Sequence, residues 1–263
     1  MISTVFPTST PQLTGVRLQV RNLQPQLSYW RRQIHRRPEL GFQESQTAAL
    51  ISKKLSEWGI EHRREVARTG IVAIIPGHCP GPVLAVRADM DALPIQELNE
   101  VEYRSQHSSV MHACGHDGHV AVALGTAYYL SQHRDSFCGT VKIIFQPAEE
   151  GPGGAKPMIE AGALENPGVD AIIGLHLWNN LPIGTVGVCS GAMMAATEFF
   201  HCTIQGRGGH GAIPHQTVDS IVVAAQVINA LQTIVSRNVD PLKSAVVTVG
   251  EIHAGQHSAK RWS

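Results

Sequence analysis

The chain has 263 residues, enough for one large domain or two smaller ones. Apolar residues make up 43% and charged residues 16%, values that are typical of a soluble globular protein with a buried core. The 21 basic residues balance the 21 acidic ones, so no positive field favours binding to nucleic acid or to an anionic membrane. We therefore expect small molecules or a second copy of the chain as partners.

The N-terminus and the cysteines indicate a cytoplasmic protein. Residues 1–15 are rich in Ser, Thr and Pro, which predicts a disordered leader without the charged and apolar parts of a secretory signal. No apolar run approaches the roughly 20 residues that span a bilayer. The five cysteines are odd in number and scattered, which favours a reducing compartment over a disulfide framework.

Helix-like and strand-like segments alternate from residue 16 to residue 190. Spacing and composition predict helices over 16–37, 44–58, 120–130 and 155–163. Short apolar runs with β-branched residues predict buried strands at 70–76, 82–88, 140–145 and 169–176. This alternation predicts an α/β domain with a mostly parallel sheet over residues 16–190.

Residues 191–263 have a different character. The pattern predicts strands over 198–205 and 244–253, with a long helix over 217–235 between them. We therefore expect a separate, smaller α+β domain.

Polar side chains follow three of the predicted strands. Asp89-Met-Asp91 follows one strand, Glu149-Glu150 follows another, and His176 ends a third. Ligands of open α/β sheets bind at the carboxyl ends of the strands, so we expect these side chains to lie close together. The segment with Cys114 and His116 opens a helix and is expected at the same place.

The types of side chain predict a metal site. Thiolate and imidazole favour zinc or manganese over magnesium or calcium, and Gly115 lets Cys114 and His116 turn toward one ion. Paired glutamates suit a division of roles in which one binds metal and the other takes a proton from water. His112 and His119 fit a supporting role better than direct ligation.

These motifs resemble the M20 metallopeptidase family, in particular its amidohydrolase branch of N-acyl-amino-acid amidohydrolases, hippurate hydrolases and auxin-conjugate hydrolases. The resemblance covers about residues 16–255, and it is specific because the motifs are long and occur in order. The matching segments are His35-Arg-Arg-Pro-Glu-Leu-Gly-Phe-Gln-Glu44, Arg87-Ala-Asp-Met-Asp-Ala-Leu-Pro94, Met111-His-Ala-Cys-Gly-His-Asp-Gly-His119, Phe145-Gln-Pro-Ala-Glu-Glu-Gly151, Gly174-Leu-His-Leu177 and Gly206-Arg-Gly-Gly-His-Gly-Ala-Ile-Pro-His215.

The resemblance implies a site for two divalent metal ions, Mn²⁺ or Zn²⁺. The implied ligands are Cys114, His116, Glu150 and His176. The implied fold is a zinc-peptidase-like catalytic domain with a smaller, ferredoxin-like domain that serves as a lid and forms a homodimer.

The resemblance also implies the reaction, which is hydrolysis of the amide bond of an N-acyl amino acid. Glu149 would be the general base, and Asp91 would be a supporting carboxylate near the metals. His210 of the small domain would bind the substrate carboxylate or the developing oxyanion.

The chain departs from this family in its length. Family members run longer, and their returning segment supplies a last histidine ligand, so we expect both domains to be incomplete and one ligand to lie beyond Ser263. An inactive, metal-binding remnant of such an enzyme is therefore the alternative to an active hydrolase. A structural metal-binding domain is a third reading, but ligands from several strand ends and a spare glutamate argue against it.

Overall fold

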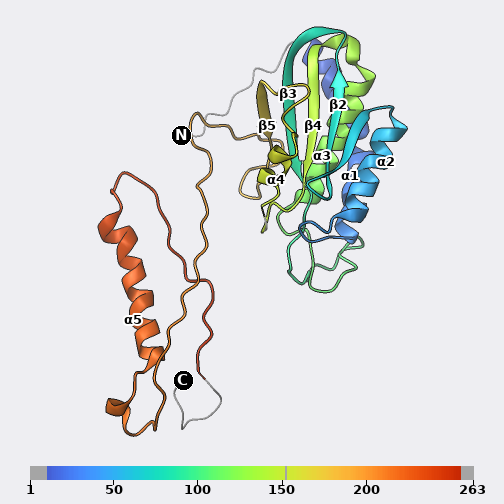
Figure 1. The fold of residues 1–263 in the computed structure, drawn as a ribbon. Helices are drawn as coiled ribbons and strands as arrows, with labels where there is room; N and C mark the ends of the chain where they lie inside the picture. The colour runs from blue at the N-terminus through green and yellow to red at the C-terminus, as the bar shows by residue number, and fades with distance from the viewer. Residues whose placement is uncertain (1–10, 152, 256–263) are drawn as a thin grey trace. The chain divides into compact units, whose positions relative to one another are not determined.

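A computed structural model describes residues 11–151 and 153–255. The chain divides into two compact units, Met1–Cys189 and Ser190–Ser263 (Figure 1). The division lies one residue from the predicted boundary between 190 and 191. Each unit is described by itself.

A five-stranded sheet forms the centre of the first unit (Figure 1). Its strands are β1 (Glu61–Val66), β2 (Gly70–Pro76), β3 (Cys79–Asp89), β4 (Cys138–Gln146) and β5 (Ala171–Gly174), in the order β1-β2-β4-β3-β5. β3 pairs in parallel with β4 and β5, whereas β2 pairs antiparallel with β1 and β4.

The prediction of a mostly parallel sheet is therefore wrong, because half of the strand pairings are antiparallel. Residues 67–69 are the only connection between β1 and β2, and so short a link permits only an antiparallel pair. Sequence reasoning also missed β1 altogether. Five of its six residues, Glu-His-Arg-Arg-Glu, are charged or polar, as suits an exposed strand at the edge of a sheet.

Three helices pack on one face of the sheet. These are α1 (Pro11–Arg36), α2 (Ser45–Glu57) and α3 (His116–Gln132), and their core contains Trp30, Ile51 and Leu124 together with strand residues such as Ile71 and Phe145. Alternate strand residues face the other side. There Val72, Ala85 and Ile144 pack with Met158 of α4 (Ala155–Glu160). The sheet is thus buried on both faces near its centre.

Most predicted elements of this unit are confirmed to within a few residues. The strand predicted at 169–176 is present as β5, but the prediction that it is buried is wrong, because β5 is the last strand of the sheet and its four residues are exposed. α1 begins earlier than expected. It starts at Pro11, so residues 11–15 are helical rather than part of a disordered leader, and the rest of that predicted leader, residues 1–10, lies outside the described residues. Proline is favourable in the first turn of a helix because its fixed φ suits the helix and its missing N–H has no partner to lose there.

The second unit contains one long helix, α5 (Ser220–Thr233), which continues as a π-helical turn, Ile234–Asn238. Asp219 caps α5 by accepting hydrogen bonds from the N–H groups of Ile221 and Val222 at 2.9 and 3.2 Å. The strands predicted at 198–205 and 244–253 are wrong for the described part of this unit, residues 190–255, which forms no strand. Two strand-like segments are fewer than the three strands that a stable sheet generally needs.

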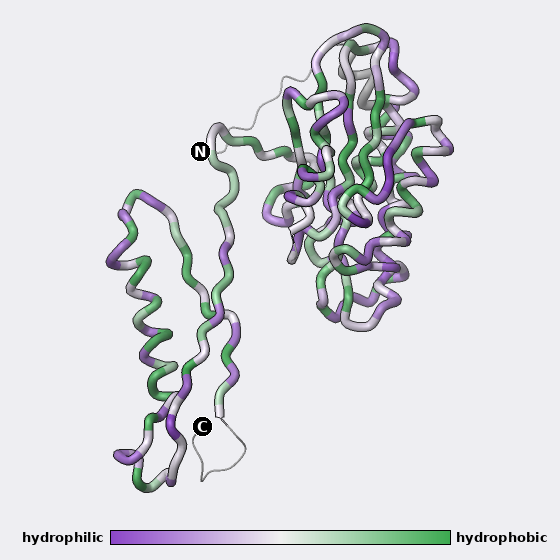
Figure 2. Tube along the Cα trace, in the orientation of Figure 1, coloured by the Kyte–Doolittle hydropathy of each residue, from purple (hydrophilic) through white to green (hydrophobic). Residues whose placement is uncertain are grey.

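Apolar residues follow the central strands of the first unit, whereas α5 mixes apolar and polar residues (Figure 2). Within the described residues, Ser220–Asn238 alone is long and apolar enough to cross a membrane by length and composition, with a mean hydropathy of 1.2 over 18 of its 19 residues. The expectation that no apolar run approaches this length is therefore wrong. Polar Gln226, Asn229 and Gln232 recur at helical spacing, however, as they do in a helix that covers an apolar core.

The odd number and scattered spacing of the cysteines predicted no disulfide framework. The structure corrects this prediction, because it contains a disulfide between Cys79 and Cys138. These two residues are register partners on the adjacent strands β3 and β4. Their separation of 59 residues in sequence gave no sign of this pairing, which the sheet register produces.

Candidate metal centre

The predicted site residues gather at the carboxyl ends of three strands, because the strands that carry them run in parallel. β3 ends at Asp89, β4 ends at Gln146 shortly before Glu149, and β5 ends at Gly174, two residues before His176. The carboxyl ends of these strands therefore meet, as expected for a ligand site of an α/β sheet.

The N-terminus of α3 adds a thiol and an imidazole at the same place. Gly115 adopts a left-handed conformation with φ of +88°, which is readily accessible only to glycine. This turn separates Cys114 from His116, the first residue of α3, and brings both side chains into the cluster. His116 is buried, with 1% of its surface exposed.

His116 lies at the centre of the cluster. Its Nδ1 contacts Asp91 Oδ1 at 3.2 Å, while its Nε2 lies 3.7 Å from Glu150 Oε1 and 3.9 Å from Glu149 Oε2. Both His116 Nε2 and Glu150 Oε1 are buried and have no hydrogen-bond partner in the described part of the chain. Two unpartnered polar atoms that face each other at this distance fit a shared cation.

Cys114 and His176 form the second part of the cluster. Cys114 Sγ lies 3.3 Å from His176 Nε2. The ring N–H at Nδ1 of His176 donates to the carbonyl of Leu177 at 2.7 Å, which leaves Nε2 with its lone pair directed toward the thiol. Ligand atoms of Cys114, His116 and His176 all lie within 4.8 Å of one another, as do those of His116, Glu149 and Glu150. His116 belongs to both triplets and to a third, with Asp89 and His119.

Asp91 connects His116 to the loop after β4. One carboxylate oxygen contacts His116 Nδ1, and the other accepts a hydrogen bond from the backbone N–H of Glu150 at 2.9 Å. Burial acts to raise the pKa of Asp91, but the hydrogen bonds from His116 and from the backbone outweigh it and hold the pKa low. Asp91 therefore orients one ligand and positions the other, which fits a supporting carboxylate.

Asp89, which the sequence placed at the site without a specific role, plays a similar part for His119. The ring N–H at Nδ1 of His119 donates to Asp89 at 2.5 Å, and Nε2 accepts the backbone N–H of Leu177 at 2.9 Å. His119 therefore holds the segment next to His176, and its ligand atoms also lie within 4.8 Å of those of Asp89 and His116, so its supporting role stays a prediction. Asp89 Oδ1 also lies 3.7 Å from His116 Nε2, so its carboxylate reaches the cluster.

The other histidine of the motif, His112, is buried, and neither of its ring nitrogens has a hydrogen-bond partner in the described residues. Burial is the main reason that its pKa falls to about 4. His112 is therefore neutral at pH 7, and no ligand atom of it joins the triplets found among the described residues.

The electrostatics of the site favour a cation. Burial, followed by the hydrogen bond to Glu150 and its charge, raises the pKa of Cys114 to about 12. Burial and the neighbouring Glu150 charge also raise the pKa of Glu149. A bound divalent cation reverses this effect, because it stabilises a coordinating thiolate and the nearby carboxylates.

A glutamate outside the cluster holds the loop that carries the paired glutamates. Glu44 is fully buried and accepts hydrogen bonds from the N–H of Ala148 at 2.8 Å and the hydroxyl of Thr69 at 2.5 Å. Ala148 has a positive φ of 51°, so the loop turns sharply just before Glu149. Glu44 lies in one of the motifs noted above, but the sequence alone gave it no structural role.

His210 belongs to the second unit, where its Nδ1 accepts the N–H of Ala212 at 3.1 Å. Its role in binding substrate therefore remains a prediction. The structure brings together Cys114, His116, His176, Glu149, Glu150 and Asp91 within the first unit.

Comparisons with known proteins identify relatives of this chain. Among curated relatives, the chain is 49% identical over 233 residues to the N-acetyl-L-cysteine deacetylase of Bacillus subtilis strain 168, an alignment covering 89% of this chain and 56% of the relative. It is 50% identical over 227 residues to an N-acyl-L-amino acid amidohydrolase of Geobacillus stearothermophilus, covering 86% and 61%. A solved Bacillus subtilis structure, described as a dinuclear metal binding peptidase from the M20 family, matches with a TM-score of 0.66 and 42% identity, covering 81% of this chain and 57% of that one.

The chain thus spans less than two thirds of the length of each of these relatives. Residues 85–256 match the family described as peptidase family M20/M25/M40. This match includes every side chain of the cluster. The chain therefore belongs to peptidase family M20/M25/M40.

Proposed function

We propose that the protein is a metal-dependent amidohydrolase that hydrolyses the amide bond of N-acyl amino acids. The observation that carries this proposal is the unpartnered pair His116 Nε2 and Glu150 Oε1, 3.7 Å apart, with a second carboxylate, Glu149, beside them. The relatives named for deacetylation and amide hydrolysis support the same reaction class.

The ligand set is Cys114, His116, Glu150 and His176, and the resemblance points to two divalent ions, Mn²⁺ or Zn²⁺. When bound, such ions polarise a carbonyl group and lower the pKa of water. Asp91 holds His116 by its Nδ1, so that Nε2 faces the metal position.

Glu149 is the proposed proton carrier. Its side chain is 42% exposed, so water and substrate can reach it, whereas Glu150 is more buried at 23%. A carboxylate in this position can take a proton from water at one of its oxygens and then donate that proton to the leaving nitrogen. His210 is proposed to bind the substrate carboxylate or the oxyanion.

We further propose a cytoplasmic homodimer that forms through the small domain and binds neither nucleic acid nor membrane. The balanced charge of the chain, with 21 basic and 21 acidic residues, supports the absence of a nucleic-acid partner.

The test compares Glu149→Gln with wild type on N-acetyl and N-benzoyl amino acids, together with metal content by mass spectrometry. We expect kcat to fall by roughly 10²–10⁴-fold while metal content stays near that of wild type. Glu160→Gln, on the exposed end of α4, is the matched control and should behave as wild type. Normal turnover by Glu149→Gln would overturn the assignment of the base. Wild-type chain that binds metal without turnover would instead support the inactive remnant.

A further inference from the structure

A second cluster of metal-ligating groups lies at the opposite ends of the strands of the same sheet, where β3 and β4 begin. Cys79 begins β3 and Cys138 begins β4, and the two residues are partners in the parallel ladder. Asp89, at the other end of β3, is the tenth residue after Cys79, so this cluster lies on the order of 30 Å from the first one. It is therefore separate from the proposed catalytic site.

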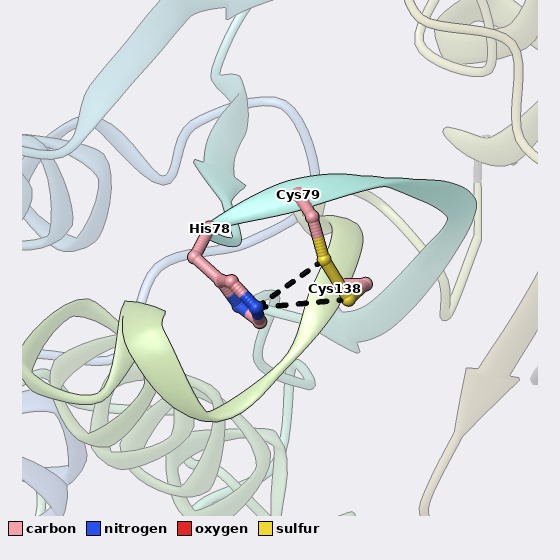
Figure 3. Close-up of side chains that lie close together, drawn as sticks. All are labelled: His78, Cys79 and Cys138. Carbon is pink, nitrogen blue, oxygen red and sulfur yellow. Dashed lines mark hydrogen bonds between the residues drawn. A yellow bond between two sulfur atoms is a disulfide. The ribbon is translucent and has the colours of Figure 1, made fainter.

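His78 completes this cluster (Figure 3). Its Nε2 lies 3.4 Å from Cys79 Sγ and 4.0 Å from Cys138 Sγ. The three ligand atoms lie within 4.8 Å of one another. All three residues are at least partly exposed, so ions and reductants in solution can reach them.

The backbone holds the imidazole in the orientation that a ligand needs. The ring N–H at Nδ1 of His78 donates to the carbonyl of Phe137 at 2.7 Å, which leaves the lone pair on Nε2 directed at the sulfurs. The same carbonyl accepts the backbone N–H of His78 at 3.1 Å. Histidine ligands in metal sites commonly donate their second ring N–H to a backbone carbonyl in this way.

The glycines around the cluster allow the close approach of its two chain segments. A Cβ at Gly77 would lie 2.4 Å from the Phe137 carbonyl oxygen, and one at Gly139 would lie 2.1 Å from the Pro82 oxygen. Gly139 also has a positive φ of 83°. The position of His78 over the two cysteines thus depends on backbone contacts that only glycine permits.

We propose that His78, Cys79 and Cys138 form a redox-controlled metal site, which binds a zinc-like divalent ion once the disulfide is reduced. In a tetrahedral zinc site, bond lengths of about 2.0 and 2.3 Å place nitrogen and sulfur ligands about 3.5 Å apart. The two distances from His78 Nε2 to sulfur are close to this value. Two thiolates and one imidazole supply three ligands, and water at the exposed side supplies the fourth.

The redox step balances with a dithiol as the reductant. The dithiol is oxidised to its own disulfide, and two electrons and two protons pass to Cys79 and Cys138, which become thiols. Metal binding then releases these two protons to solvent. Reversal requires loss of the metal and a disulfide oxidant. Disulfides of cytosolic proteins are mostly transient or redox-sensing, which agrees with a reversible bond here.

The test uses cobalt(II) as a spectroscopic probe of thiolate ligands. The full chain carries Cys114→Ser throughout, so that no thiolate of the first site contributes. Protein reduced with dithiothreitol and desalted without oxygen should bind one cobalt at this site, with a thiolate-to-cobalt charge-transfer band that zinc abolishes. Unreduced protein should show no band, and a thiol assay of the denatured chain should find two fewer thiols than after reduction.

Single substitutions test the contribution of each of the three ligands to cobalt binding. Cys79→Ser and Cys138→Ser should each lose the two-thiolate band, while His78→Ala should keep both thiols but bind cobalt about tenfold or more weakly. Cys202→Ser, an exposed cysteine of the second unit, is the matched control and should retain the band.

Two results would overturn the proposal. One is reduced protein without a charge-transfer band, and the other is unchanged cobalt affinity in His78→Ala. The first result would leave an ordinary structural disulfide, and the second would exclude His78 from the metal site. Circular dichroism checks that each variant is folded. Two of these experiments change no cysteine of the site. They are the comparison of reduced with unreduced protein and the measurement on His78→Ala. Both therefore test the proposal even if a cysteine variant unfolds.

Discussion

His116 Nε2 lies 3.7 Å from Glu150 Oε1, and neither buried atom has a hydrogen-bond partner in the described part of the chain. Leaving buried polar atoms unpaired costs about 1–3 kcal/mol for each group. A cation between them removes this cost, since both atoms then coordinate it. The same pair is therefore costly without metal and stabilising with it.

Glu150→Gln should break this link between metal and stability. In wild type, zinc at 100 times its Kd should raise the free energy of unfolding by about 2.7 kcal/mol, because the ion binds the folded state alone. The variant loses the charge of one ligand, so the same zinc concentration should raise its Tm much less. Thermal melts with and without zinc measure the effect. An equal zinc-induced shift in wild type and Glu150→Gln would contradict the assignment of Glu150 as a ligand.

The His35–Asp117 pair should give stability that depends on pH. The hydrogen bond from His35 Nδ1 to Asp117, at 2.8 Å, raises the pKa of His35 above its ordinary value of 6.5, although burial opposes the shift. A raised folded-state pKa contributes stability that is complete below pH 6.5 and disappears as the pH rises through the raised value. The difference in free energy of unfolding between wild type and His35→Gln should therefore shrink as the pH rises above 6.5.

Urea unfolding of both proteins over this pH range measures the difference. Gln24→Ala, which changes an exposed and uncharged side chain of α1, is the control and should show no such trend. A difference between wild type and His35→Gln that is constant with pH would contradict the ion pair.

Glu44→Ala should loosen the loop that carries Glu149. The substitution removes the acceptor for the buried N–H of Ala148, which should lower the free energy of unfolding by about 1–3 kcal/mol. Glu44→Gln retains an oxygen acceptor of the same shape and should lose less. Urea unfolding gives the stability of both variants, and equilibrium dialysis gives their zinc affinity. If Glu44→Ala matched Glu44→Gln in both measurements, the hydrogen bond to Ala148 would have no measurable role.

Gly115→Ala should weaken metal binding through the backbone alone. At φ of +88°, a side chain costs about 1–2 kcal/mol, and relief of this strain moves Cys114 relative to His116. We expect lower stability and weaker zinc binding, measured by thermal melts and dialysis. Gly168→Ala is the control, because its added Cβ meets no atom within 4 Å and its φ is not positive. Wild-type zinc affinity in Gly115→Ala would show that the turn does not set the ligand geometry.

The central elements of the first unit could be predicted from the sequence because their signals are local. The apolar run that forms β2 and the helical spacing that forms α2 need no information about distant residues. The second unit was harder to predict. Its segments 198–205 and 244–253 alternate like strands, but alternation becomes a ladder only when partners are available, and the described residues there form none.

The sequence by itself determined the residue types of the candidate site and placed them after strand ends, since local patterns mark both the strands and the polar residues that follow. Only the tertiary structure decided the strand order, which seats β4 between β2 and β3. That order aligns Asp89 with Gln146 where β3 and β4 end, and Cys79 with Cys138 where these two strands begin. Pairing between residues as far apart as Cys79 and Cys138, which are separated by 59 positions, depends on the register of the whole sheet, which no local pattern records.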